Sequence, residues 1–107
     1  MTRASDPAVE ALIAAARADF AGTLVYKAVA LEALVSCGAW EDARRAAHKL
    51  RGSAGVYGFA ELGAAAAELD DVLSRVEETP DAAQQALVRE KLRELCALAE
   101  HASRAGR

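Results

Sequence analysis

Aromatic side chains are scarce in this 107-residue chain, which contains one Trp, two Tyr and two Phe. A core without many large rings must be built from small and aliphatic side chains, and hydrophobic residues still make up 53% of the chain. Alanine is the commonest of them, and it has the highest helix propensity of all residues. Because the length fits one domain, the composition predicts a single all-α domain over residues 1–107.

Long apolar runs and an excess of basic charge are also missing. No stretch approaches the roughly 20 apolar residues that a membrane-spanning helix needs. A net charge of −3 and a pI of about 5.4 argue against a dedicated nucleic-acid binder. Glu10 and Arg17 interrupt the N-terminal apolar pattern, so we expect no signal peptide and a cytoplasmic location. Met1 and the short tail favour a free-standing protein.

Cysteine and histidine are equally rare. Cys37 and Cys96 lie far apart in apolar helical stretches, so no disulfide framework is expected and both thiols should be buried and reduced. The two histidines, His48 and His101, show no metal-ligand spacing, and residue 45 is Arg where a bundle metal site would use the Glu of Glu-x-x-His. We therefore expect no metal and no other cofactor. His101, near the end of the chain, should be solvent-exposed.

What the chain has instead is five helical stretches without an alternating strand pattern. Ser5 or Asp6 can cap the first stretch ahead of Pro7, and the second stretch stops near Gly38. The break between them, around residues 21–23, is weakly marked, so the two could also form one bent helix. Their apolar positions are Val9, Leu12, Ile13, Ala16 and Phe20 in the first and Leu24, Ala28, Leu31 and Val35 in the second.

The remaining three stretches carry similar stripes. Residues 40–57 form the third, with Gly58 as a stop, and Thr79 can cap the last helix with Pro80 in its first turn. Residues 103–107 should fray. The apolar positions are Trp40, Ala43, Ala47, Leu50, Ala54 and Tyr57, then Phe59, Leu62, Ala66, Leu69, Leu73 and Val76, then Val88, Leu92, Leu95 and Ala99. The pattern predicts an antiparallel up-and-down four-helix bundle with an additional N-terminal helix.

His48 stands apart from the apolar stripe of its helix. Arg44 lies four residues before it, and Arg51 and Gly52 lie three and four residues after it, so all four share one exposed surface. A glycine inside a helix costs about 1 kcal/mol relative to alanine, and an exposed position recovers none of that by packing. Gly52 leaves open space one turn from the imidazole, where the backbone of a partner can approach.

The residues around His48 suit an anion. Arg51 can present forked donors to phosphate oxygens, and Arg44 and Lys49 add positive potential. A neutral imidazole has a nucleophilic lone pair near neutral pH. An accessible imidazole beside a phosphate-binding cation predicts a histidine that becomes phosphorylated.

The segment AHKLRGSAGVYGFAELGAAAAELDDVL resembles the histidine-containing phosphotransfer (HPt) domain of bacterial multistep phosphorelays. The family has His, an apolar residue two positions later, Lys or Arg at three and Gly at four, followed by small residues and a later Gly. These positions are His48, Leu50, Arg51, Gly52, Ser53, Ala54 and Gly58 here. Residues 38–41 are similar to the family's lead-in to the active helix, and the likeness covers about residues 18–77.

The resemblance implies a phosphocarrier with no ATP site of its own. The imidazole, phosphorylated on Nε2, accepts the group from the aspartyl phosphate of a receiver domain and passes it to another receiver, which carries the Mg²⁺. The partners are response-regulator receivers and a hybrid histidine kinase, and we expect a monomer. A polar residue of the next helix commonly bonds Nδ1, and Asp70 has that position. Asp is shorter than the more usual Gln or Glu, so the sequence leaves its reach to His48 open.

The candidate catalytic residues are therefore His48, Arg51 and Asp70, and the candidate docking residues are Arg44, Lys49, Gly52 and Gly55. Arg51 replaces the commoner Lys and keeps its charge. The alternative function is a helical adaptor that binds a receiver or histidine kinase through the same surface without passing phosphate. The GxxGxxG spacing has no preceding strand and no following GK[ST], which argues against a nucleotide site. Glu68 and Asp71 belong to an ordinary solvated face.

Overall fold

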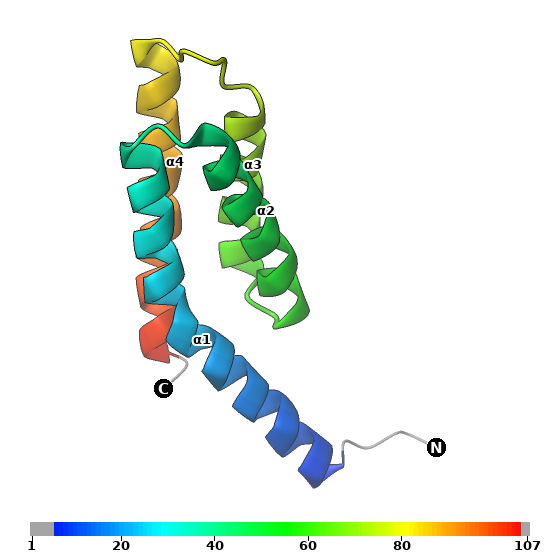
Figure 1. The fold of residues 1–107 in the computed structure, drawn as a ribbon. Helices are drawn as coiled ribbons and strands as arrows, with labels where there is room; N and C mark the ends of the chain where they lie inside the picture. The colour runs from blue at the N-terminus through cyan, green and yellow to red at the C-terminus, as the bar shows by residue number, and fades with distance from the viewer. Residues whose placement is uncertain (1–5, 106–107) are drawn as a thin grey trace.

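A computed structural model describes residues 6–105 as four helices. They are α1 (Pro7–Ser36), α2 (Trp40–Val56), α3 (Ala60–Ser74) and α4 (Ala82–Ala105). Consecutive helices run in opposite directions (Figure 1). Residues 6–105 contain no strand, so the prediction of an all-α domain is confirmed.

The first two predicted stretches are one continuous helix, so the additional N-terminal helix is not a separate element. Asp6 caps α1 by accepting a 2.9 Å hydrogen bond from the Ala8 N–H, whereas the other candidate cap, Ser5, lies outside the described residues. α1 changes direction between its blue and cyan parts (Figure 1). Thr23 donates its hydroxyl to the Phe20 carbonyl at 2.7 Å within this helix, a bond that often bends helices without ending them.

The N-terminal part of α1 extends past the end of α4 (Figure 1). Val9, Leu12 and Ile13 are consequently exposed, and the core begins at Phe20. These three residues belong to the apolar stripe of the first stretch, yet they lie outside the core. A helical period predicts which side of a helix is apolar, but burial also requires a neighbouring element at that height.

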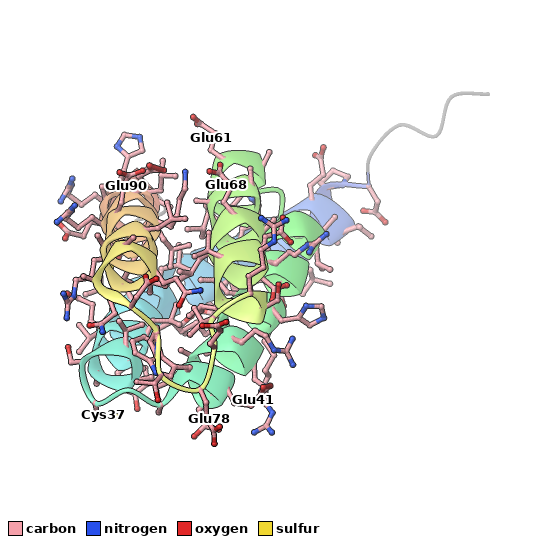
Figure 2. The ribbon with its side chains drawn as sticks, turned by 90° about the horizontal axis from the view of Figure 1, so that it is seen from above. Cys37, Glu41, Glu61, Glu68, Glu78 and Glu90 are labelled. Carbon is pink, nitrogen blue, oxygen red and sulfur yellow. The ribbon has the colours of Figure 1, made fainter. Side chains whose placement is uncertain are left out.

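The core lies between helices that pack in ring order, with each helix against the next and α4 against α1. Viewed from above, the four helices surround a common centre (Figure 2). The largest fully buried side chains are Leu24, Leu31, Leu69, Leu95 and Val88. From α2 the core receives mainly alanines, since Ala43, Ala47 and Ala54 are completely buried. One side of α2 is thus fixed against the bundle, and the other is free to carry a site.

Tight turns set the ends of α1 and α2. Gly38 and Gly58 have φ angles of 75° and 81°, a left-handed conformation that side chains with a Cβ rarely adopt. Gly58 follows Tyr57, the C-cap of α2, so its predicted role as the stop signal is confirmed.

The last helix begins and ends later than expected. Asp81 accepts from the Gln84 N–H at 2.8 Å while Gln84 Oε1 accepts from the Asp81 N–H at 3.2 Å, and this reciprocal capping pair replaces the predicted Thr79 and Pro80 start. α4 then continues to Ala105, and Ser103 is buried, so the helix is intact where fraying was predicted to begin. Residues 106–107 of the predicted frayed tail lie outside the described part of the chain.

Candidate functional site

His48 lies near the middle of α2 with 65% of its side chain exposed. Ala47 and Leu50, on either side of it in sequence, are buried against the bundle. The ring is therefore outside the core, where its offset from the apolar stripe predicted it to be.

Asp70 of α3 holds one side of the imidazole. Its Oδ2 lies 2.9 Å from His48 Nδ1, and only 8% of the Asp70 side chain is exposed. Asp70 therefore reaches His48 despite being shorter than Gln or Glu, which answers the question left open by the sequence. An ionised carboxylate only accepts hydrogen bonds, so Nδ1 is the protonated nitrogen. The lone pair of a neutral ring is then on Nε2, the nitrogen left without this contact.

Two arginines of α2 approach the same carboxylate. Arg51 Nη1 is 3.5 Å from Asp70 Oδ2, and Arg44 Nη1 is 3.9 Å from Asp70 Oδ1. Arg44 also donates from Nε and Nη2 to Glu41 Oε1, at 3.1 and 2.8 Å. Arg44, which was predicted to be a docking residue, also lies close to the buried Asp70 carboxylate, and its docking role stays a prediction. Arg51 is half exposed beside the imidazole.

The glycines after His48 leave the surface of α2 open. A Cβ added to Gly52 or Gly55 would meet no atom within 4 Å outside its own helix, so neither glycine is required by packing. Both residues are exposed, as is Lys49. This stretch of α2 is thus a bare and partly positive surface next to the ring.

A groove between α1 and α2 adjoins this surface, and sequence reasoning did not find it. It has a volume of about 240 Å³, with Tyr26 and Ala30 of α1 on one side and Ala46, Lys49 and Ser53 of α2 on the other. Tyr26 is 77% exposed although it is one of the few aromatic residues. The signal in the sequence is a large aromatic ring that lies off the apolar stripe of its helix. The charged and nucleophilic residues that predicted the site do not include it.

A larger hollow, of about 680 Å³, lies at the N-terminal end of α2. Half of the residues that line it are charged, among them Glu41 and Glu78, which lie at the same end of the bundle (Figure 2). It contains no histidine or cysteine. Its one hydroxyl, that of Ser74, donates to the Asp71 carbonyl at 2.7 Å, so His48 stays the candidate for phosphorylation.

The other candidate residues lie away from His48. His101 is exposed on α4, as expected. Cys37 is exposed, so the expectation of two buried thiols is wrong for that residue, because it follows the last turn of α1 rather than facing the core. Cys96 is half buried, and burial together with nearby Glu32 raises the pKa of its thiol to about 11. Both cysteines are free.

Acidic residues near the site are otherwise ordinary surface groups. Glu68, expected on a solvated face, is exposed and forms a 2.8 Å ion pair with Lys91 of α4, and Asp71 is exposed. Within residues 6–105, no three or more His, Cys, Asp or Glu side chains gather in a group that could hold a metal ion. No helix of the described chain is long and apolar enough to span a membrane.

The fold and the site together define a helical bundle that presents an exposed imidazole, bonded to a buried carboxylate, on the outer face of one helix. The family model described as the Hpt domain matches residues 8–105, and the chain belongs to this family. No curated protein and no solved structure is significantly similar to it. Hpt domains are phosphocarriers of phosphorelays that work with receiver domains and kinases and have no ATP site of their own.

Proposed function

We propose that His48 accepts a phosphoryl group from the aspartyl phosphate of one receiver domain and passes it to the aspartate of another. The observation that carries this proposal is the 2.9 Å contact between His48 Nδ1 and the buried Asp70 carboxylate beneath an exposed ring. It keeps the proton on Nδ1 and leaves Nε2 as the nucleophile.

In the first transfer, a bond forms between Nε2 and phosphorus while the bond between phosphorus and the aspartyl oxygen of the donor breaks. The donor recovers its carboxylate, and the imidazole becomes positively charged with its proton still on Nδ1. Asp70 stabilises that charge at hydrogen-bond distance. The second transfer is the reverse reaction with a different receiver.

Charge on the moving phosphoryl oxygens also needs stabilisation, because phosphoryl transfer relies on positioning and electrostatics. Arg51 is one turn beyond His48, and half of its side chain is exposed, so its guanidinium can leave Asp70 and turn toward the oxygens. Mg²⁺ is expected on the receiver. Lys49, Gly52 and Gly55, with the groove beside Tyr26, then form the surface on which the receiver docks.

Transfer from a phosphorylated receiver tests the proposal directly. The protein should gain one phosphate that is labile in acid and stable in base, as expected for a phosphoramidate. His48→Gln should gain none while still binding the receiver, and His101→Gln is the matched control that should be labelled normally. ATP alone should label neither. Phosphate that persists in His48→Gln would contradict the proposal, and an unlabelled wild-type protein that binds the receiver would support the adaptor instead.

A further inference from the structure

The two oxygens of the Asp70 carboxylate have different partners. Oδ2 contacts His48 Nδ1 and Arg51, whereas Oδ1 forms, among residues 6–105, a longer ion pair with Arg44, whose Nη1 lies 3.9 Å away. Only 8% of the Asp70 side chain is exposed, so water can replace these partners only in part. The orientation of the carboxylate therefore depends on both arginines.

Arg44 is itself held in place by Glu41, one turn earlier in α2. Its Nε and Nη2 both donate to Glu41 Oε1, and this leaves Nη1 directed to Asp70. A guanidinium is planar and rigid, so fixing two of its nitrogens also fixes the third. Glu41, Arg44, Asp70 and His48 thus form a continuous chain of polar contacts from the helix N-terminus to the imidazole.

The next residue provides an internal comparison. Arg45 pairs with Asp42 at 3.0 Å, with the same three-residue spacing as Arg44 and Glu41. However, the Arg45 side chain is 65% exposed, against 35% for Arg44, and its ion pair ends at Asp42. Of these two adjacent ion pairs, one leads to the site and the other stays on the surface.

We infer that Arg44 is a positioning residue for phosphoryl transfer, which holds Asp70 Oδ1 so that Oδ2 stays aligned with His48 Nδ1. This inference rests on the proposed function and gives Arg44 a role other than receiver docking. Arg44 matters most when Arg51 turns to the phosphoryl oxygens, because it is then the one of these two arginines that remains beside the buried carboxylate. Without it, the Asp70 side chain can rotate and the hydrogen bond that selects Nε2 is weakened.

A donor too small to dock separates positioning from docking. Phosphoramidate, used as the phosphodonor, transfers its phosphoryl group to Nε2 as its P–N bond breaks and ammonia leaves, while the proton on Nδ1 remains. Arg44→Gln should slow this labelling by roughly two- to fivefold, the size expected for one ion pair in a partly exposed site. Arg45→Gln should be labelled at the wild-type rate. Arg44→Lys, which keeps the charge, should recover part of the loss.

A double-mutant cycle shows whether Arg44 acts through Asp70. In an Asp70→Asn background, adding Arg44→Gln should have no further effect on the rate. The ¹⁵N NMR spectrum of His48 gives a second readout, because the fraction of the ring protonated on Nδ1 should fall in Arg44→Gln and stay unchanged in Arg45→Gln. Circular dichroism establishes that each variant is folded.

The inference is overturned if Arg44→Gln is labelled by phosphoramidate at the wild-type rate, even if transfer from a receiver is impaired, because that pattern belongs to a docking residue. It is also overturned if Arg45→Gln is slowed equally, or if the effect of Arg44→Gln survives in Asp70→Asn. None of these results affects the proposed function, which fails only if the phosphate is not on His48.

Discussion

The two faces of α2 differ in what their side chains are required to do. The inner face is small and apolar, and Ala43, Ala47 and Ala54 are completely buried in the bundle. The outer face carries His48, exposed and bonded to Asp70 of α3, followed by two glycines with open space around them. Packing selects the residues of the inner face, whereas the outer face contains residues that packing does not explain. Substitutions on the two faces should therefore affect different measurements.

The largest effect on stability is expected at Leu50 on the inner face. Leu50→Ala removes a buried side chain and should lower the free energy of unfolding by about 2–5 kcal/mol. Urea denaturation followed by circular dichroism measures this change. In the absence of urea, at a temperature at which the variant is still folded, the rate of phosphate labelling at His48 should match that of the wild type. A change in stability below 1 kcal/mol would show that the inner face is less tightly packed than its burial indicates.

Arg51→Ala on the outer face should affect the rate of transfer and leave stability nearly unchanged, the opposite of Leu50→Ala. Stability should change little, while transfer from a phosphorylated receiver should slow by roughly 10- to 100-fold, because a charged donor to the phosphoryl oxygens is lost. Rapid-quench kinetics at saturating receiver measure the rate. Arg51→Lys keeps the positive charge and should retain most of the wild-type transfer rate. If Arg51→Ala transferred phosphate at the wild-type rate, Arg51 would have no part in stabilising the phosphoryl oxygens.

Gly52→Gln should separate docking from reactivity. The new side chain enters open space, so the fold should be as stable as the wild type or more stable by up to about 1 kcal/mol. Labelling by a receiver should fall more than tenfold, because the side chain occupies the space that the receiver backbone needs. Labelling by phosphoramidate should not change. Ala86→Gln, which places the same side chain on an exposed position of α4, is the matched control for both measurements.

The smallest effect is expected from Lys49→Ala. An exposed charge at the edge of a docking surface is worth about 0.2–1 kcal/mol, so the affinity for the receiver should fall by no more than a few-fold. The loss should shrink at high salt, where the charge is screened. Titration of the receiver at two salt concentrations measures it. A loss that is independent of salt would mean that Lys49 acts through the groove beside Tyr26 rather than through its charge.

The two halves of α1 show where sequence patterns stop being informative. Leu24 and Leu31 lie on the apolar stripe and are buried, whereas Leu12 and Ile13 have the same kind of spacing and are exposed. The difference arises because α4 ends at Ala105 and leaves the first part of α1 without a helix beside it. The length of a helix depends on where its caps form, as Asp81 and Gln84 do at the start of α4. A small error in the predicted position of a cap changes which apolar residues lie beside a neighbouring helix.

The candidate site divides in a similar way. His48, Arg51 and Gly52 lie within five residues of one helix, so their common face followed from the helical period alone. The sequence could place Asp70 opposite His48 only by resemblance to a family, and it left the reach of a short side chain open. The contact of Arg44 with Asp70 and the groove beside Tyr26 had no counterpart in any sequence pattern, because each joins residues of two different helices.

The all-helical chain, the turns at Gly38 and Gly58, and the exposed face of α2 with His48 and Arg51 could all be predicted from the sequence. These features depend on local propensities and on spacings of three and four residues, which the linear order contains. The packed bundle was needed to show that Asp70 is buried 2.9 Å from His48 Nδ1, that Arg44 lies 3.9 Å from the same carboxylate, and that the beginning of α1 is left uncovered. The physical reason is that these features depend on the distance between helices and on where each helix ends, and both are set by how the small side chains of the core pack together.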